Sequence, residues 1–407
     1  MTPSQSVELA GHRIAFVTSL LDVGGSTTWL CDLAGELLKR GMAVRVFSLK
    51  ENHPLAAEYR ERGIEVVVQN DRRLIYEERL LATLEAVSDF QPTVVVGWTG
   101  APAYEALRYV PQGIQRIGVL HSDFPPVYEA AKPYEPSMDQ IAVLSPRMVE
   151  ASLASFQCPP DKIRLIRLGV EIPEAAGHRD RDDAEPLRIL YLGRVQQEQK
   201  RVLLFPEILR HLSATSMPFV WTIAGDGSER AQLEELMISK NPAQVVRVIG
   251  GVAYSKIHAL LQEHDIFLLA SDYEGLSHTL LEAMGQGLVP VVSDIPSGMR
   301  EVVDGTTGVL VDVNDVPGYA RAMHWLHSHR PEMAVMSQAA AQRVRDQFSI
   351  QVMTDQWLAM VPSQPSAVAS WPRKFTIKRP LVHSWPWACM EPFRTVRRIV
   401  RRLSTKL

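Results

Sequence analysis

Cysteine is scarce in this chain of 407 residues. Its three cysteines, Cys31, Cys158 and Cys389, are odd in number and far apart, so they indicate neither a disulfide framework nor a metal site. This pattern predicts a reducing, cytoplasmic environment. The first residues lack a basic segment followed by an apolar one, which argues against a signal peptide. No apolar run is long enough to span a bilayer.

Other signals that would identify an enzyme class are missing as well. The net charge of −3 provides no overall basic field for nucleic acid. There is no nucleophile elbow and no Walker loop, and acidic residues do not cluster as they would at a catalytic metal site. The glycine loop at Gly24 and Gly25 lacks the third glycine of the dinucleotide fingerprint, so a nicotinamide oxidoreductase is poorly supported. We therefore expect neither a metal nor a resident cofactor.

What the chain does contain is an alternation of short β-rich runs with helical stretches. The length suggests two domains, because one core rarely grows beyond about 250–300 residues. Residues 173–186 are charged, bounded by prolines and poor in apolar residues, which predicts a linker. The alternation predicts an α/β fold with a doubly wound parallel sheet in residues 1–172 and a second in residues 187–348.

The stretch from Ile266 to Val292 is the most informative. It begins with an apolar strand, 266–270, and continues through a polar loop, 271–277. A helix is expected to begin near Ser277 or His278 and to end at the glycines 285 and 287, before a second strand at 288–292. Such a strand-loop-helix junction directs free backbone N–H groups and the positive end of a helix dipole toward one point, which favours a phosphate.

Two acids flank this junction. Glu274 lies in the loop and Glu282 lies on the helix. Carboxylates accept hydrogen bonds from sugar hydroxyls, so an acid on each side of a phosphate site suggests a polyhydroxylated ligand. The combination predicts a nucleotide-sugar site.

Two cations follow another predicted strand, 187–192. Arg194 comes directly after Gly193, and Lys200 follows six residues later. Both are expected at the carboxyl-terminal edge of the second sheet, where Arg offers a bidentate fork for phosphate and Lys a compact charge. Solvated surface charge is the common alternative for such residues, and their position at a strand end favours the functional interpretation.

Further strand ends carry weaker signals. His121 follows the buried run 117–120 and is expected to face a ligand cleft, although a lone histidine is more often structural. Gly24 and Gly25 precede a helix and could approach an anion, with a simple tight turn as the alternative. The segment 224–227 resembles half of a dinucleotide fingerprint, and we interpret it as a turn with a helix cap.

The end of the chain differs in composition from the rest. Residues 371–407 contain ten lysines and arginines against one acid, Glu391, a balance of about +9, whereas residues 1–370 carry about −12. Residues 392–403 place apolar side chains on one helical face and arginines on the other, and Trp371, Trp385 and Trp387 lie nearby, before this segment. This pattern is typical of an interfacial membrane anchor; the alternative is a helix that packs on the acidic remainder of the protein.

With these residues in place, the chain resembles the retaining glycosyltransferases of family four, which have a GT-B fold of two Rossmann-like domains facing a cleft. The resemblance is strongest from Tyr191 to Asp315, through YLGRVQQEQKR, AGDG and the Glu-x7-Glu motif with its following Ala-Met-x-x-Gly. It implies an acceptor-side first domain and a nucleotide-sugar-binding second domain. It also implies that residues 349–361 form a helix returning to the first domain, whereas the tail at 362–407 lies outside the shared pattern.

The resemblance implies roles for the second domain. Glu282 would hold the ribose hydroxyls of the nucleotide, and Glu274 would contact hydroxyls of the donor sugar. The backbone N–H groups of Gly275, Leu276 and Ser277 would hold the sugar and the diphosphate. Arg194 and Lys200 would neutralise the leaving diphosphate, as a metal ion does in other transferases.

It also implies roles for more distant residues. His121 would touch the donor sugar near the reacting centre. Gly24 and Gly25 would lie near the phosphates, with Gly25 making the approach. The backbone at Gly251 and Val252 would meet the base.

The function that follows is a metal-independent retaining glycosyltransferase that moves a hexosyl group from a UDP- or GDP-sugar. Its expected acceptor is a lipid-linked saccharide or an envelope polysaccharide, at an anionic membrane surface on the cytoplasmic side. The alternatives are a soluble transferase with a small-molecule acceptor and a nucleotide-sugar-binding protein without turnover. Two departures leave the donor open: Arg201 replaces the Gly usual after the lysine, and Ser277 stands where Gly or Pro is commoner.

Overall fold

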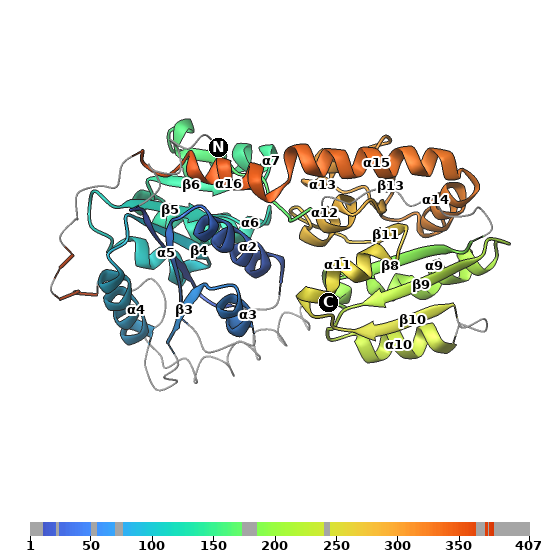
Figure 1. Ribbon diagram of the computed structural model, residues 1–407, viewed down its shortest axis with the longest axis horizontal. Helices are drawn as coiled ribbons and strands as arrows, with labels where there is room; N and C mark the ends of the chain where they lie inside the picture. The colour runs from blue at the N-terminus through green and yellow to red at the C-terminus, as the bar shows by residue number, and fades with distance from the viewer. Residues whose placement is uncertain are drawn as a thin grey trace, which may run out of the picture. The chain divides into compact units, whose positions relative to one another are not determined.

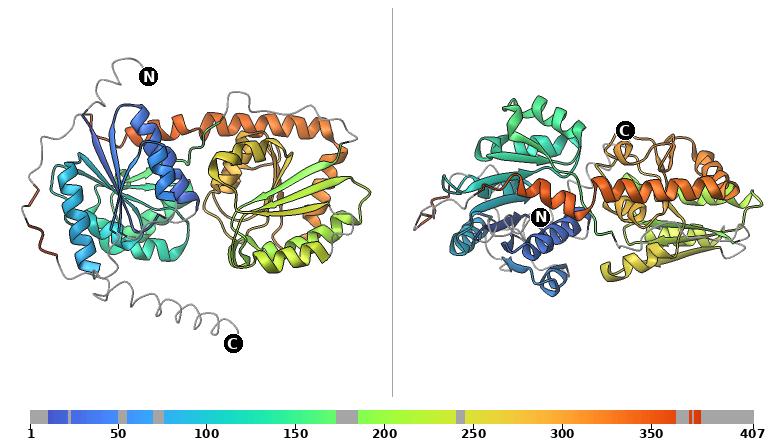
Figure 2. Two further views of the ribbon diagram at one scale, coloured as in Figure 1. Left: turned by 60° about the horizontal axis from the view of Figure 1, so that its bottom comes forward. Right: turned by 45° about the horizontal axis from the view of Figure 1, so that its top comes forward.

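The computed structural model describes residues 11–21, 24–49, 55–69, 76–172, 185–239, 245–363, 371–372 and 374–377. The chain divides into two compact units, each organised around its own parallel sheet (Figures 1 and 2). Unit 1 comprises Met1–Val143, Val149–Leu165 and Trp357–Leu407, and unit 2 comprises Leu144–Met148 and Ile166–Gln356. The predicted fold class, two doubly wound parallel-sheet domains, is confirmed.

Unit 1 contains a seven-stranded sheet whose strands pair in parallel. The central strands are runs of apolar residues and are buried, as expected for strands covered on both faces. The strands in spatial order are β3 (Glu65–Val68), β2 (Ala43–Ser48), β1 (Arg13–Thr18), β4 (Val94–Thr99), β5 (Gln115–Val119), β6 (Gln140–Val143) and β7 (Ile163–Leu165).

The helices of unit 1 follow its strands in the alternation that the sequence predicts. Helix α2 shows why: Leu30, Leu33, Ala34 and Leu37 recur at helical spacing and are buried. The helical segments are α2 (Gly25–Lys39), α3 (Leu55–Glu61), α4 (Tyr76–Phe90), α5 (Ala101–Leu107), α6 (Pro125–Ala131), η1 (Lys132–Ser137), α7 (Pro146–Phe156) and η2 (Pro160–Lys162), and the first three residues of α7 fall in unit 2.

Unit 2 contains a six-stranded sheet, again with parallel pairing. Its strands in spatial order are β10 (Val246–Gly250), β9 (Phe219–Ala224), β8 (Leu187–Leu192), β11 (Ile266–Leu269), β12 (Val289–Ser293) and β13 (Val309–Val311). Its helical segments are α8 (Gln197–Lys200), η3 (Val202–Leu204), α9 (Phe205–Ser213), α10 (Arg230–Ser239), α11 (Tyr254–Gln262), α12 (His278–Gly285), α13 (Met299–Val302), α14 (Val316–Ser328), α15 (Arg330–Gln347) and α16 (Ile350–Leu358). The chain passes from unit 2 to unit 1 near the end of α16, between Gln356 and Trp357.

The strand order of unit 2 determines where its polar loops meet. The chain runs outward from β8 to β9 and β10 and then returns to place β11 on the other side of β8, with Ile266 opposite Ile189. This reversal is a topological switch point, where open α/β sheets bind ligands beyond the carboxyl ends of their strands. It places the segment 193–200, after β8, beside the loop 271–277, after β11.

Two predictions fall on residues that are only partly described. Residues 173–184 of the expected linker, and all of the tail except 362–363, 371–372 and 374–377, lie outside the described residues. Among the described helices, none combines the length and the apolar character that crossing a membrane requires.

Candidate functional site

The loop between β11 and α12 ends in a helix start that is built for an anion. Ser277 is the N-cap of α12, and its hydroxyl accepts a hydrogen bond from the Leu280 N–H at 3.3 Å. In the described part of the chain, the backbone N–H groups of Gly275, Leu276 and Ser277 donate to no protein acceptor. Ser277 therefore replaces the commoner Gly or Pro with a residue that caps the helix and leaves these three donors available.

The far end of α12 also forms as the sequence predicts. The helix ends at Gly285, and Gly287 adopts a left-handed φ of +85°. The N–H of Leu288 donates to the Ala283 carbonyl, and the N–H of Gly287 donates to the Met284 carbonyl. These two bonds form a Schellman motif, which ends the helix and directs the chain into β12.

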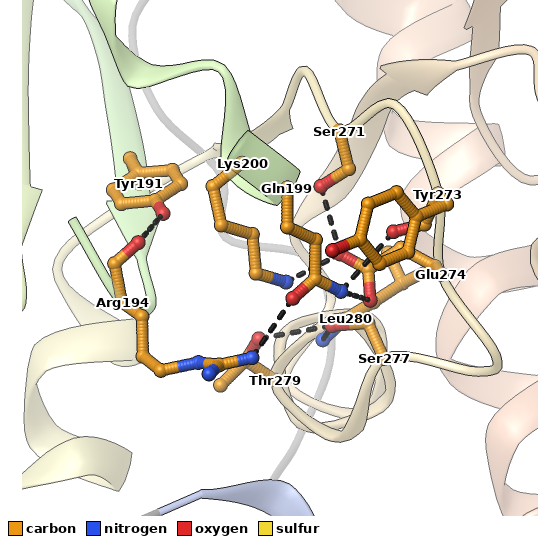
Figure 3. Close-up of polar contacts among 10 residues, drawn as sticks. All are labelled: Tyr191, Arg194, Gln199, Lys200, Ser271, Tyr273, Glu274, Ser277, Thr279 and Leu280. Atoms are coloured by element: carbon orange, nitrogen blue, oxygen red, sulfur yellow. Dashed lines mark hydrogen bonds and ion pairs between the residues drawn. The ribbon is translucent and has the colours of Figure 1, made fainter. Parts of the chain in front are cut away.

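Glu274 lies at the centre of a polar cluster at this switch point (Figure 3). Its Oε1 accepts hydrogen bonds from the Lys200 ammonium and from the Ser271 hydroxyl, the latter at 2.7 Å. The Lys200 and Glu274 side chains are only 10% and 7% exposed. In such a setting the pair interacts more strongly than a surface ion pair would, and each charge compensates the burial of the other.

Gln199 connects this carboxylate to the second cation. Its amide N–H donates to Glu274 Oε2 at 3.3 Å, and its amide oxygen accepts from an Arg194 N–H at 2.8 Å. Arg194 is exposed, and its own carbonyl accepts from the Tyr191 hydroxyl at 2.6 Å. Burial raises the pKa of the Tyr191 phenol, which keeps this donor protonated. The structure thus brings Arg194, Lys200 and Glu274 together, as the sequence predicts.

Glu282 lies farther along α12 and is almost fully buried. Its Oε2 lies 3.5 Å from Nδ1 of His278, one turn earlier, and the two side chains are 3% and 4% exposed. Glu282 Oε1 is buried and has no hydrogen-bond partner in the described part of the chain. A buried carboxylate oxygen without a donor is costly, so it is a candidate acceptor for ligand hydroxyls.

His121 lies in unit 1 at the end of β5, among aromatic rings. Its ring centroid is 4.9 Å from that of Trp98 and 5.2 Å from that of Trp29, and its Nε2 contacts the Trp98 carbonyl oxygen. Burial lowers the pKa of this imidazole to about 4, so the ring is neutral near pH 7. Its Nδ1 has no hydrogen-bond partner in the described part of the chain.

The remaining predicted residues lie at loop positions next to helices. Gly24 is the N-cap of α2 and Gly25 is the first residue of that helix, and the Gly24 carbonyl accepts from the Thr27 N–H. Gly251 and Val252 connect β10 to α11. The roles that the resemblance implies for these residues stay predictions.

Two contributors to the cluster were not predicted. Ser271 and Gln199 both donate to the Glu274 carboxylate. Each lies within a few residues of a predicted residue at a strand end, and this proximity was the available signal. Their contacts depend on how the β8 and β11 loops pack against each other, which spacing along the chain does not reveal.

Two features of the backbone shape the cluster: a close approach of two strand ends and a residue in a left-handed conformation. A Cβ at Gly225 would lie 1.8 Å from the Gly193 carbonyl oxygen, so glycine there permits the strand ends to approach. Arg201, directly after Lys200, adopts a left-handed φ of +51°. Its side chain donates to the Val313 carbonyl at 2.6 Å and pairs with Asp272 at 3.1 Å. These contacts offset the strain and explain how a side chain is tolerated where glycine is usual.

Among the described residues, no group of three or more His, Cys, Asp or Glu side chains is arranged to hold a metal ion.

The chain belongs to the family-four glycosyltransferases. Residues 23–173 match the family described as Glycosyltransferase Family 4, and residues 178–343 match Glycosyl transferases group 1. These two matches fall on the two parallel-sheet units and confirm the resemblance that the sequence motifs indicate.

Individual relatives agree with this membership. The amylovoran biosynthesis glycosyltransferase AmsK of Erwinia amylovora is 32% identical over 231 residues, which cover 54% of this chain and 56% of AmsK. The lipopolysaccharide core biosynthesis glycosyltransferase LpsE of Rhizobium meliloti is 30% identical over 148 residues, covering 36% of this chain and 42% of LpsE. The chain thus spans about half the length of these two relatives.

Solved structures show the same fold. Anabaena Alr3699/HepE in complex with UDP superposes with a TM-score of 0.69 at 16% identity, covering 85% of this chain and 98% of that one. The lipopolysaccharide outer core galactosyltransferase WaaB in its apo form gives a TM-score of 0.65 at 19% identity, covering 86% and 99%. The fold is therefore GT-B.

Proposed function

We propose that the protein is a retaining glycosyltransferase that moves a hexosyl group from a UDP- or GDP-sugar to a saccharide acceptor in polysaccharide synthesis. One observation carries the proposal. At the switch point of unit 2, Lys200, Arg194 and Glu274 form one hydrogen-bonded cluster beside the N–H groups that begin α12. This arrangement supplies two cations and a helix start for a diphosphate, and a carboxylate for sugar hydroxyls.

The chemistry can be assigned to these groups. The donor's diphosphate would lie against the N–H groups at 275–277, with Lys200 and Arg194 meeting the charge that develops on the departing phosphate. The bond from the anomeric carbon to the phosphate oxygen breaks as the acceptor oxygen bonds to that carbon on the same face. The acceptor's proton passes to the departing phosphate oxygen.

Glu274 is assigned to the sugar hydroxyls and is not the nucleophile. Its carboxylate accepts from three side chains, those of Lys200, Ser271 and Gln199. Donors on both oxygens stabilise the anion and lower its reactivity toward carbon. The neutralisation of the leaving group by two side-chain cations supports a reaction that does not depend on a metal.

A thermal-shift screen followed by a turnover assay tests the proposal. UDP or GDP should raise the melting temperature, because a ligand that binds the folded state stabilises it by mass action. Cleavage of a UDP- or GDP-sugar should persist in a chelator and be lost in Glu274→Ala. Binding without any turnover, across a panel of donors and acceptors, would instead identify a nucleotide-sugar-binding protein.

The names of the relatives and the composition of the tail support a choice of acceptor. AmsK and LpsE are named for amylovoran and lipopolysaccharide core synthesis, which favours a growing envelope polysaccharide or a lipid-linked saccharide. The basic composition of residues 371–407 favours contact with an anionic membrane on the cytoplasmic side.

Sedimentation of the protein with anionic liposomes should fall when residues 371–407 are removed. Equal sedimentation would refute the membrane role and leave a soluble small-molecule transferase as the alternative.

A further inference from the structure

Gln199 makes three polar contacts that join the two strand-end loops of the site. Its Nε2 donates to Glu274 Oε2 at 3.3 Å and to the Tyr273 carbonyl at 3.1 Å, while its Oε1 accepts from Arg194 at 2.8 Å. Figure 3 shows the amide between the guanidinium and the carboxylate. The Gln199 carbonyl also accepts from the Asp272 N–H at 2.9 Å, so the main chain joins the same two loops.

The chemistry of this position requires an amide. The group must accept from a cation on one side and donate to an anion on the other, and a primary amide does both without a charge of its own. A carboxylate could accept from Arg194 but could not donate to Glu274 when ionised. A methionine of similar length would do neither.

Arg194 depends on this contact for its orientation. Its side chain is exposed, and in the described part of the chain Gln199 is the side chain that its guanidinium contacts. A long exposed side chain loses conformational freedom when it binds a ligand, so holding it beforehand strengthens binding. Lys200, in contrast, is held directly by Glu274.

We propose that Gln199 is a positioning residue that holds Arg194 for the leaving diphosphate and, through its other end, orients Glu274 for the donor sugar. This inference rests on the proposed function, because it assigns those two residues to parts of the donor. It predicts that one side chain affects both nucleotide affinity and the sugar-dependent step.

The first test measures binding without turnover. Gln199→Met should lower the affinity for UDP or GDP about fivefold to tenfold, the cost of ordering one long side chain on binding, with little change in melting temperature. Gln262→Met, at an exposed position at the end of α11, is the matched control and should leave affinity unchanged. A purely structural role would give the opposite result, a lowered melting temperature with affinity intact.

The second test uses the pH dependence of donor cleavage. Gln199→Glu places a second carboxylate beside Glu274, so its deficit relative to wild type should be tenfold or more at pH 8 and shrink toward pH 6 as the two carboxyls share a proton. Gln199→Met introduces no charge, and its deficit should be constant over that range. Gln262→Glu adds the same charge elsewhere in unit 2 and should follow the wild-type profile.

The outcomes distinguish a failure of the positioning role of Gln199 from a failure of the proposed function. If the wild type binds UDP or GDP and cleaves a donor but both Gln199 variants match it in affinity and pH profile, the positioning role is wrong and the proposed function stands. If the wild type neither binds a nucleotide nor cleaves any donor, the proposed function fails, and the role of Gln199 fails with it.

Discussion

Lys200 and Glu274 form an ion pair whose side chains are 10% and 7% exposed, between the loops that follow β8 and β11. Removing one partner from a buried pair leaves the other charge without compensation, which typically costs about 3 to 5 kcal/mol. We expect Lys200→Met to lower the free energy of unfolding by about 3 kcal/mol, the lower end of that range because Ser271 and Gln199 still donate to Glu274. Urea denaturation measures this change.

Two further variants determine whether burial is the cause. Adding Glu274→Gln to Lys200→Met should recover part of the loss, because no buried charge then remains unpaired. Lys39→Met removes an exposed lysine that pairs with Glu36 at 3.7 Å and should cost about 0.5 kcal/mol or less. Equal losses for Lys200→Met and Lys39→Met would contradict the interpretation.

The neutral state of His121 predicts how stability depends on pH. Burial lowers the pKa of this imidazole from 6.5 to about 4 in the folded protein. The unfolded chain therefore binds a proton before the folded chain does, so the stabilisation is complete above about pH 6.5 and is lost as the pH falls toward 4. The residue as a whole is partly exposed, so we expect a loss of about 1 to 3 kcal/mol across this window.

Urea denaturation at several pH values between 7.5 and 4.5 measures this dependence. His121→Asn should lose less stability on acidification than the wild type, because the perturbed group is absent. The exposed His324, changed to Asn, is the control and should behave as the wild type does. If the free energy of unfolding fell equally with pH in the wild type and in His121→Asn, another group would be responsible for the loss of stability at low pH.

The elements that form the fold could largely be predicted from sequence because their apolar patterns are regular. The strand Leu187–Leu192 has the bounds that its pattern predicts, and helix α12 begins at His278 and ends at Gly285, as its pattern predicts. The strands β7 and β13, of three residues each, and the proline-containing segments α6 and η1 were not predicted. Three residues give too little periodicity, and prolines usually mark turns.

The sequence could predict which residues of the candidate site lie at one edge of the sheet. Arg194, Lys200 and Glu274 all follow predicted strand ends, and the structure confirms that they lie together. The bridge through Gln199 could not be predicted, because it depends on side-chain packing between loops distant in sequence. Gly225 was interpreted as part of a turn, whereas its absent Cβ makes room for the Gly193 carbonyl at the adjacent strand end.

Arg201 provides a test of strain beside the site. A left-handed conformation costs a residue with a Cβ roughly 1 to 2 kcal/mol, and glycine avoids this cost. Arg201→Ala keeps the strain and loses the contacts to Val313 and Asp272, so it should destabilise the protein by about 2 to 3 kcal/mol. Arg201→Gly loses the same contacts but relieves the strain, and it should be about 1 kcal/mol more stable than Arg201→Ala.

Gln157 provides a test of the backbone strain without accompanying side-chain contacts of the kind that Arg201 makes. It also has a left-handed φ, +54°, but its side chain is exposed. Gln157→Gly should therefore raise the free energy of unfolding by up to about 1 kcal/mol, as measured by urea denaturation. If Arg201→Ala proved as stable as Arg201→Gly, the backbone strain at Arg201 would be too small to matter, whatever Gln157 shows.

Replacing Glu282 should weaken nucleotide binding without lowering the stability of the folded protein. Its Oε1 has no partner in the described part of the chain, and its Oε2 lies 3.5 Å from His278, so the folded protein gains little from this buried charge. If the carboxylate holds the ribose hydroxyls, Glu282→Ala should weaken UDP or GDP binding by about 1.5 to 3 kcal/mol, the range for hydrogen bonds that involve a charge. The melting temperature without ligand should stay level or rise, since a buried charge is removed. Glu235→Ala, at an exposed position on α10, is the control and should change neither quantity.

Calorimetric titration with UDP and GDP measures the affinity of the Glu282→Ala variant. Unchanged affinity would exclude the ribose role, and a large fall in melting temperature would show that the carboxylate supports the fold instead.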